Sequence, residues 1–180
     1  ASVEAAIAEL MQREGRIDLL VNNAGVGIAP AAAEESSLAQ VQAIFDTNVF
    51  GTVRMTHAVL PVMRAQGSGR ILNVGSVLGF IPAPFSAHYS AAKHAIEGYS
   101  ESLDHEVRGF GVRVSVIEPG ATNTSFEGSA IPRDRTLDAY NTLRLKYQLA
   151  FGRTMADADT AQSVAKTVVV AAREAMSRRI

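Results

Sequence analysis

The chain has 180 residues, a formal net charge of -1 and no cysteine, which excludes disulfides, thiolate zinc sites and a cysteine nucleophile. This length predicts one domain, 1–180, and the near-neutral charge excludes the basic composition expected with a nucleic-acid partner. Because no apolar run reaches the roughly 20 residues of a membrane span, and a signal-peptide pattern is missing, we expect a cytoplasmic protein without a membrane span.

The chain begins with a predicted helix and a predicted strand. Apolar residues recur at helical spacing from Val3, and Gly15 is expected to end this helix. Residues 17–21 form a short, largely apolar run that leads into Asn22-Asn23-Ala24-Gly25. This pattern is typical of a buried strand followed by a tight loop.

A long helix and a second strand are predicted next. Helical periodicity continues over residues 38–66, with irregularities expected at Gly51 and Pro61. Residues 71–74 are apolar enough for a second buried strand, which ends at Gly75-Ser76.

The following helix is expected over residues 87–108, with Ser86 as its cap. Its apolar positions are Ala92, Ile96, Tyr99, Leu103 and Val107. Its polar face is predicted to carry His94, Glu97, Glu101, Asp104 and Arg108. A third strand is predicted over residues 112–117 and leads into Glu118-Pro119-Gly120.

After Gly120 the pattern is less regular. Residues 123–135 are polar, helices are expected over 137–151 and 157–176, and residues 178–180 resemble the start of another strand. Short strands that alternate with long amphipathic helices predict an α/β fold with a partial, doubly wound parallel sheet and helices on both faces.

Tyr89 and Lys93 are the first candidates for chemistry. They are four residues apart, so they share one face of the predicted helix and hold an ammonium within reach of a phenol. A tyrosine needs its pKa shifted by roughly 3 units, about 4 kcal/mol, to exchange protons near neutral pH, and a neighbouring cation supplies part of this. The alternative is a partly buried ring beside a solvated charge.

Small or turn-forming residues follow all three strands, at Asn22 to Gly25, Gly75-Ser76 and Pro119-Gly120. Ligands of open parallel sheets bind beyond the carboxyl ends of the strands, where small residues let a ligand approach the backbone. Ordinary turns are the alternative for each of these segments taken alone.

Five motifs, in this order and spacing, resemble the short-chain dehydrogenase/reductase family over roughly residues 1 to 125. They are Asn22-Asn23-Ala24-Gly25, Asn48, Ser76, Tyr89-x-x-x-Lys93, and Pro119-Gly120 with Thr122 and Thr124. The resemblance implies a Rossmann-type NAD(P)-dependent oxidoreductase that interconverts an alcohol and a ketone or aldehyde.

The resemblance also implies a role for each site residue. Tyr89 would donate or accept the proton, Lys93 would lower the pKa of Tyr89 and hold the nicotinamide ribose, and Ser76 would orient the substrate oxygen. Asn48 would hold a water in the proton relay. The cofactor would be NADP or NAD, with NADP slightly favoured. Its implied contacts are Asn22, Ala24 and Gly25 near the adenine-side ribose, and Pro119, Gly120, Thr122 and Thr124 near the nicotinamide.

The glycine fingerprint that seats the cofactor's pyrophosphate in this family is absent. The chain also begins almost at once inside a predicted helix and stops at the start of a predicted strand. We therefore expect that both ends of the chain are truncated. Two alternatives remain open: a protein that binds NAD(P) as a sensor or scaffold without catalysis, and an inactive fragment without a pyrophosphate site.

The substrate is expected to be a small, hydrophobic molecule. Segments 80–85 and 126–151 would form the walls of its pocket, and the second of these lies within the expected lid segment, residues 121–156. Their apolar and aromatic residues are Phe80, Ile81, Phe85, Phe126, Ile131, Leu137, Tyr140 and Phe151. Pro84-Phe85 and the residues 97–103 are similar to the steroid and retinol branch of the family. The resemblance further implies a homodimer or homotetramer, and the four histidines show no pattern of a metal site.

Overall fold

Three short parallel strands form the centre of the fold. The computed structural model describes residues 2–177, with the side chains of residues 127 and 174–177 left out. The strands β1 (Leu19–Asn22), β2 (Gly69–Val74) and β3 (Val112–Ile117) lie in the order β1-β2-β3. Leu20 pairs with Ile71, and Ile71 pairs with Val114. The predicted parallel sheet is therefore confirmed.

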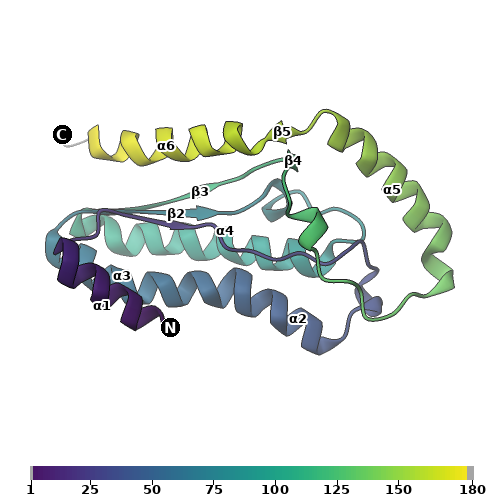
Figure 1. Cartoon of the computed structure of the whole chain (residues 1–180), viewed down its shortest axis with the longest axis horizontal. Coiled ribbons are helices and arrows are strands. Elements are labelled where there is room, and N and C mark those ends of the chain that lie inside the picture. Colours follow the sequence, from purple (N-terminus) through teal and green to yellow (C-terminus); the bar gives the residue numbers. More distant parts are fainter. Residues whose placement is uncertain (1, 178–180) are drawn as a thin grey trace.

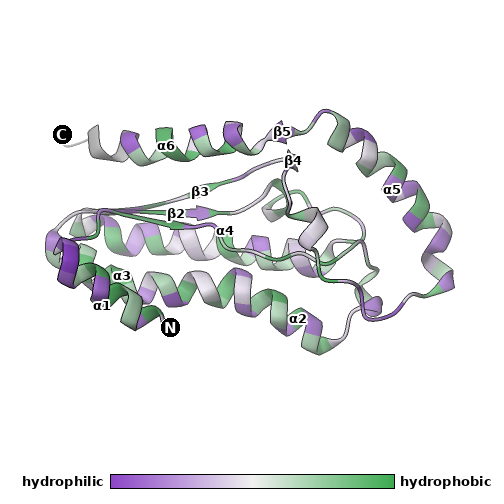
Figure 2. Cartoon of the chain, viewed as in Figure 1, coloured by the Kyte–Doolittle hydropathy of each residue, from purple (hydrophilic) through white to green (hydrophobic). Residues whose placement is uncertain are grey.

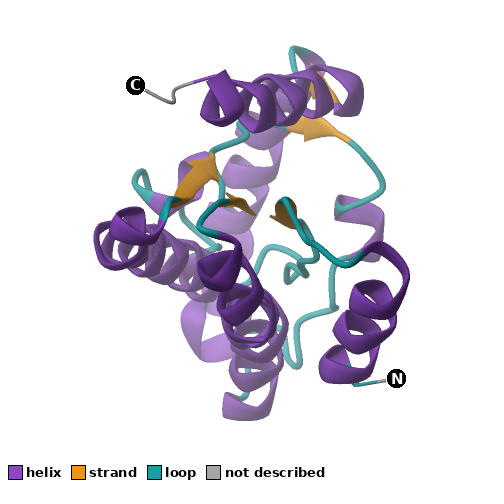
Figure 3. Cartoon of the chain, turned by 90° about the vertical axis from the view of Figure 1, so that its left-hand side faces the viewer, coloured by secondary structure: helices purple, strands orange, loops and turns teal. Residues whose placement is uncertain are grey.

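Helices cover both faces of this sheet, as predicted. On one side lie α3 (Gly51–Gln66) and α4 (Ala87–Val107), with α1 (Val3–Glu14) beside α3 (Figure 1). The helix α6 (Ala161–Ser177) lies on the other side, and the view along the sheet separates it from α1, α3 and α4 (Figure 3). The predicted strand at residues 178–180 lies outside the described residues.

The core lies between the sheet and the helices α3 and α4. Ile71 in β2 is fully buried and packs in one cluster with Val59 and Met63 of α3 and with Leu103 and Val107 of α4. Leu103 and Val107 thus face the sheet, as predicted, and Tyr99 lies at the edge of the same cluster. Ala92 instead packs in a second cluster with Ile44 and Val49. Apolar and hydrophilic stretches alternate along the outer helices, as expected of amphipathic helices (Figure 2).

The helix expected over residues 38–66 is divided in two. It consists of α2 (Leu38–Phe45) and α3, joined by a π-helical turn at Asp46–Phe50. In this turn the N–H of Gly51 bonds the carbonyl of Asp46, five residues earlier. Pro61, where an irregularity was expected, lies inside α3 without ending it. The irregularity expected at Gly51 coincides with the end of this turn, although the helical periodicity did not show that the turn is π-helical.

The C-terminal third contains a short second sheet and the helix α5. The strands β4 (Thr122–Asn123) and β5 (Asp159–Thr160) pair in parallel, and α5 (Asn141–Ala156) lies between them in sequence. The helix expected at 137–151 therefore begins later, after a 3₁₀ turn at Asp138–Tyr140. The last helix begins at Ala161, because residues 159 and 160 are extended.

Asp104 was expected on the polar face of α4 but is buried. Its carboxylate accepts hydrogen bonds from Arg113 Nε at 3.0 Å, from the N–H of Val114 at 2.8 Å and from Arg108 Nη2 at 2.7 Å. Burial by itself would raise the pKa of Asp104, but these donors outweigh it and hold the pKa at about 2. Asp104 thus ties the C-terminal part of α4 to β3.

We expect Asp104→Asn to destabilise the protein at neutral pH. A carboxylate whose pKa is lowered by folding stabilises the fold above its unfolded pKa, and this stabilisation is lost as the pH falls through the folded pKa. After allowance for solvent screening, the loss is about 1–2 kcal/mol at neutral pH. Urea unfolding at pH 7 and near pH 2 measures it, and Glu106→Gln, at an exposed position of the same helix, is the control. An equal loss in both variants would contradict this role.

Candidate active site

The carboxyl ends of the three strands meet at the N-terminal end of α4. After β2, the N–H of Gly75 donates to the carbonyl of Ile117 at 2.8 Å, and the N–H of Val77 donates to the carbonyl of Pro119 at 3.0 Å. These bonds hold Gly75-Ser76 beside Pro119-Gly120. The first turns of α4 carry Tyr89 and Lys93 to the same place.

Tyr89 lies next to Ser76, because the first turns of α4 and the loop after β2 meet at the carboxyl ends of the strands. Burial raises the pKa of Tyr89, and its hydrogen bond to the Ser76 side chain opposes the rise. Ser76 Oγ also accepts the N–H of Leu78 at 3.1 Å, which fixes the serine at the start of a 3₁₀ turn at Val77–Gly79. The ring of Phe126 covers Tyr89 with 5.9 Å between centroids. Tyr89 is therefore a half-buried phenol whose oxygen faces a second hydroxyl.

Lys93 is almost completely buried, with 6% of its surface exposed. Its Nζ donates to the carbonyl of Val74 at 2.8 Å and lies 5.6 Å from the centroid of the Tyr89 ring. Burial lowers the pKa of Lys93 from 10.5 to about 8, while the charge of Glu97 partly opposes this. The ammonium has three donors, and the described contacts use one of them.

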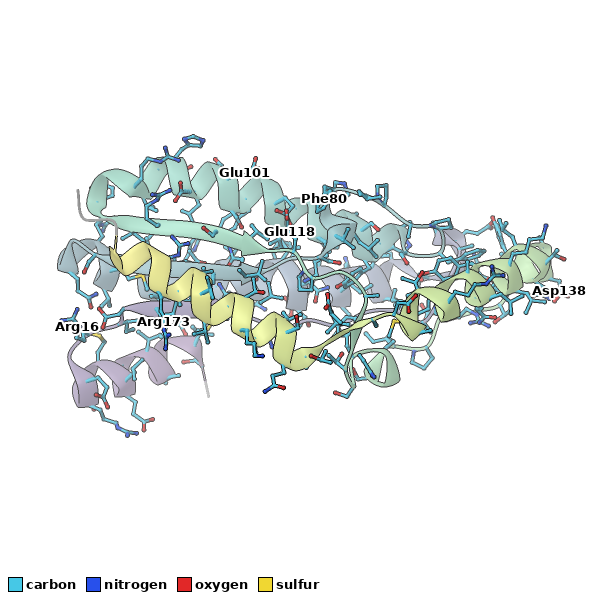
Figure 4. The ribbon with its side chains drawn as sticks, turned by 90° about the horizontal axis from the view of Figure 1, so that it is seen from above. Arg16, Phe80, Glu101, Glu118, Asp138 and Arg173 are labelled. Carbon is cyan, nitrogen blue, oxygen red and sulfur yellow. The ribbon has the colours of Figure 1, made fainter. Side chains whose placement is uncertain are left out.

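Glu97 is a residue of this site that the sequence reasoning missed. It was placed on the polar face of α4, yet its carboxylate lies against the loop after β2: a Cβ on Gly75 would come within 2.6 Å of Glu97 Oε1. Burial raises the pKa of Glu97 to about 7, and the charges of Glu118 and Glu101 add to the rise. The labelled side chains of Glu101 and Glu118 lie near this loop and Phe80 (Figure 4).

We expect Glu97→Gln to stabilise the protein at alkaline pH. Because folding raises the pKa of Glu97 from 4.5 to about 7, its ionised form is disfavoured in the fold. This penalty is absent below the unfolded pKa and fully present above the folded one. The melting temperatures of variant and wild type should therefore agree at about pH 4, diverge as the pH rises from 4.5 to about 7, and keep a constant difference at higher pH. A difference that does not change with pH would contradict the assignment.

Asn48 connects the π-helical turn to the loop after β1. Its Oδ1 accepts the N–H of Val26 at 2.8 Å, and its Nδ2 donates to the carbonyl of the same residue, also at 2.8 Å. Gly25 lies close to this amide, since a Cβ there would be 3.4 Å from Asn48 Oδ1. Asn48 therefore holds the loop 22–27 in place, and no described hydrogen bond joins it to Tyr89 or Lys93.

We expect Asn48→Ala to loosen this loop. The change leaves the partly buried N–H and carbonyl of Val26 without these partners, at about 1–3 kcal/mol in stability. Hydrogen exchange of residues 22–27 measures the effect and should rise more than exchange in β3. Unchanged exchange would show that the loop holds its conformation without Asn48.

The remaining predicted cofactor residues lie at the ends of β1 and β3. Asn22 Nδ2 donates to Asn73 Oδ1 at 2.9 Å, which joins the carboxyl ends of β1 and β2, and Ala24 is exposed. Thr122 Oγ1 donates to the carbonyl of Gly120 at 3.1 Å, and Thr124 Oγ1 accepts the N–H of Phe126 at 3.1 Å. These threonines thus shape the chain after Pro119.

The aromatic residues of the predicted pocket form two groups. Phe126 lies on Tyr89, whereas Phe85 makes an edge contact with Tyr140 and a tilted contact with Tyr147. Phe80 and Ile81 are exposed, at 51% and 58%. Among the described residues, no group of histidine and acidic side chains could hold a metal ion. No helix in the described part is long and apolar enough to cross a membrane.

Comparison with protein families gives a match to the short chain dehydrogenase model over residues 1–134. The chain belongs to the short-chain dehydrogenase family. A 3-ketodihydrosphingosine reductase of Bacteroides thetaiotaomicron is 43% identical over 125 residues, which cover 69% of this chain and 46% of that protein. Sulfoacetaldehyde reductase 2 of Chromohalobacter salexigens is 40% identical over 126 residues, or 69% of this chain and 50% of that protein.

A third relative of this short-chain dehydrogenase, estradiol 17-beta-dehydrogenase 1 of Rattus norvegicus, is 38% identical over 180 residues, with 96% of this chain and 51% of that protein covered. The chain spans about half the length of the curated relatives it matches. Each relative is named as an oxidoreductase, which supports an enzyme of this family.

Solved structures confirm the Rossmann-type fold. A short-chain dehydrogenase from Streptomyces avermitilis matches with a TM-score of 0.72 and 36% identity, over 82% of this chain and 55% of that one. ElxO with NADP bound matches with a TM-score of 0.67 and 28% identity, over 70% of this chain and 51% of that one. A 3-ketoacyl-(acyl-carrier-protein) reductase from Brucella melitensis complexed with NADH matches with a TM-score of 0.69 and 31% identity, over 72% of this chain and 55% of that one. These neighbours support NAD(P) as the cofactor of the family member.

Proposed function

We propose that this chain provides the catalytic part of an enzyme that interconverts an alcohol and a carbonyl compound, with Tyr89 as the general acid and base. The observation that carries the proposal is the contact between the Tyr89 phenol and the Ser76 hydroxyl, next to a buried Lys93. Two hydroxyls on one small site can both bond a single substrate oxygen, which is what reduction of a carbonyl requires.

Tyr89 supplies the proton in the reducing direction. As negative charge develops on the substrate oxygen, the phenol donates its proton to that oxygen, and Ser76 holds the oxygen in place through a second hydrogen bond. In the oxidising direction the same groups act in reverse: ionised Tyr89 accepts the proton from the alcohol.

Lys93 adjusts the acidity of Tyr89. Burial keeps the pKa of Tyr89 above its ordinary value in this structure, so ionised tyrosine is scarce near neutral pH. A protonated Lys93 near the ring stabilises the phenolate by Coulomb attraction in a site of low dielectric constant. Since burial brings the pKa of Lys93 down to about 8, this lysine is still mostly charged at pH 7.

The residues at the strand ends fit a nicotinamide cofactor. Lys93 keeps donors beyond its bond to Val74, exposed Ala24 leaves the backbone of its loop accessible, and Thr122 and Thr124 stand after Pro119. These residues would hold the two riboses and the nicotinamide of NADP or NAD, with NADP slightly favoured. When bound, the cofactor exchanges a hydride with the substrate carbon.

Asn48 is proposed to hold a water in the proton relay. Both polar atoms of its side chain already bond Val26, but each has a further bonding position: the second lone pair of Oδ1 and the second hydrogen of Nδ2. A water there would be fixed by the same residue that fixes the loop.

The substrate is proposed to be hydrophobic. The ring of Phe126 offers apolar surface beside Tyr89, and Phe80 and Ile81, soon after Ser76 in the chain, are exposed apolar side chains. The relatives named for ketodihydrosphingosine and estradiol agree with this class, whereas the one named for sulfoacetaldehyde indicates a polar substrate. The pocket residues therefore carry this part of the proposal. We also propose that the protein is cytoplasmic and forms a homodimer or homotetramer. Analytical sedimentation of the intact enzyme measures its oligomeric state.

Turnover of a carbonyl panel by the intact enzyme tests the function. Long-chain ketones, steroid ketones and a sulfonated aldehyde are each offered with NADPH and with NADH, and cofactor oxidation is followed. We expect turnover, with the lowest KM for an apolar ketone. Cofactor binding without turnover of any compound would contradict catalysis, and a preference for the sulfonated aldehyde would contradict the hydrophobic substrate.

A further inference from the structure

Glu35 is a completely buried carboxylate far from the catalytic residues in sequence. Its Oε2 accepts the N–H of Ala32 at 2.8 Å, its Oε1 accepts the N–H of Leu137 at 2.7 Å, and the same oxygen pairs with Arg144 Nη2. Burial would raise the pKa of Glu35, but these donors outweigh it and bring the pKa to about 2. A charged group thus joins the segment before α2 to the lid segment, residues 121–156.

Arg144 belongs to the first turn of α5 and is 5% exposed. Its Nη1 donates to Asn141 Oδ1 at 2.8 Å, and its guanidinium lies 5.7 Å from the centroid of the Phe85 ring. Arg144 therefore contacts the lid helix, the carboxylate of Glu35 and the loop before α4. Both members of the pair are buried, whereas the bonds from Arg135 and Tyr140 of the lid segment to Glu34 lie at exposed positions.

Phe85 connects this pair to the catalytic helix. It adopts φ = 59°, a left-handed conformation that is unfavourable for a bulky residue and must be held by its surroundings. Its carbonyl accepts the N–H of Ala31 at 3.1 Å, and its ring packs against Tyr140 and Tyr147. Phe85 and Tyr89 line the same small recess together with Ile28 and Ala31.

We propose that Glu35, acting through Arg144, is a positioning residue that fixes α5 against Phe85 and so sets the shape of the substrate pocket beside Tyr89. The proposal rests on the function proposed above. Glu35 touches neither Tyr89 nor Ser76 in any described contact, so its effect on the reaction passes through the position of the lid. Removal of one member of a buried ion pair leaves an uncompensated charge, which forces the local structure to rearrange.

Glu35→Gln in the intact enzyme tests this inference with an apolar ketone. We expect KM to rise about tenfold and kcat to change less than about twofold, because the variant loses binding made equally in the ground and transition states. A purely structural defect would reduce the amount of folded enzyme, which lowers kcat and leaves KM unchanged.

The exposed ion pair of Asp18 with Arg16 provides the matched control. Arg16 Nε donates to Asp18 Oδ2 at 2.8 Å, and Arg16 lies at the opposite end of the molecule from Asp138, near the start of α5 (Figure 4). Asp18→Asn should leave KM and kcat at their wild-type values. Arg144→Met should reproduce the rise in KM, and Arg144→Lys, which keeps the charge, should restore part of the affinity.

Hydrogen exchange gives a readout that does not require activity. In Glu35→Gln, exchange of residues 137–147 should increase while exchange in α4 stays at its wild-type rate. If Glu35→Gln does not fold, the KM values of Arg144→Lys and Arg144→Met show whether the buried ion pair affects substrate affinity. An active wild type whose KM is unaffected by these changes overturns the role of Glu35. A wild type without turnover contradicts the proposed function, and the exchange data then still decide whether Glu35 holds α5.

Discussion

Tyr89→Phe should lower kcat about a thousandfold, within the range that a positioned general acid contributes, and leave KM close to its wild-type value. The variant retains the ring, so its packing on Phe126 is preserved and only the proton donor is lost. Ser76 keeps its bond to the N–H of Leu78 and can still bond the substrate oxygen. Steady-state kinetics with an apolar ketone and NADPH or NADH measures both parameters.

Tyr99→Phe is the matched control for this change. Tyr99 lies on the same helix and packs against the core cluster below the sheet rather than against Ser76. It should therefore keep the wild-type kcat. If Tyr89→Phe turned over the substrate as fast as wild type, another group would have to supply the proton, and the mechanism proposed for Tyr89 would be wrong.

The sequence predicted the parts of the fold that depend on local patterns. Alternation of apolar strands and amphipathic helices is a property of neighbouring residues, and it located β2, β3 and α4 within a few residues. The spacing of Tyr89 and Lys93 gave their shared helix face for the same reason. The strand-end rule then placed Ser76 in the same region, because carboxyl ends of parallel strands meet at one edge.

Contacts between distant segments could not be predicted in this way. Glu35 and Arg144 are separated by 109 residues, and each looks like an ordinary solvated charge in its own segment. Asp104 and Glu97 were placed on a polar helix face, although β3 and the loop at Gly75 pack over that face. Helical periodicity gives the faces of a helix but not what covers them, so buried charges on a polar face were missed.

The aromatic residues of the pocket illustrate the same limit. Their composition predicted an apolar wall, but the ring of Phe85 packs against Tyr140, Tyr147 and Arg144. Among the ring–ring contacts of the described residues, Tyr89 packs against Phe126 alone. The rings thus divide into one set that holds the lid and one that borders the reacting oxygen. Substitutions in the first set should therefore change substrate affinity by moving the lid. Substitution of Phe126, in the second set, would change a direct contact with the substrate.

Lys93→Met should remove most of the activity without unfolding the protein at neutral pH. Burial lowers the pKa of Lys93 from 10.5 to about 8 in the fold, so folding disfavours its charged form. This penalty is fully present below the folded pKa and disappears above the unfolded one. A lowering of this size corresponds to a penalty of about 3 kcal/mol on the folded state, and this penalty is absent in the methionine variant.

The loss of one hydrogen bond opposes this gain. Methionine leaves the carbonyl of Val74 without its donor, at about 1–3 kcal/mol, so the free energies of unfolding of variant and wild type should be similar at pH 7. Toward pH 10.5 the wild type should become the more stable of the two, because its lysine is then largely neutral in the folded state and loses its penalty.

The activity of Lys93→Met should nevertheless fall about a hundredfold, since Tyr89 loses the cation that favours its ionised form. Urea unfolding at both pH values and steady-state kinetics separate the two effects, and Lys166→Met, at an exposed position of α6, serves as the control. Wild-type activity in Lys93→Met would contradict the role of the ammonium. A large loss of stability at pH 7 would instead mean that the buried charge stabilises the fold, contrary to the lowered pKa.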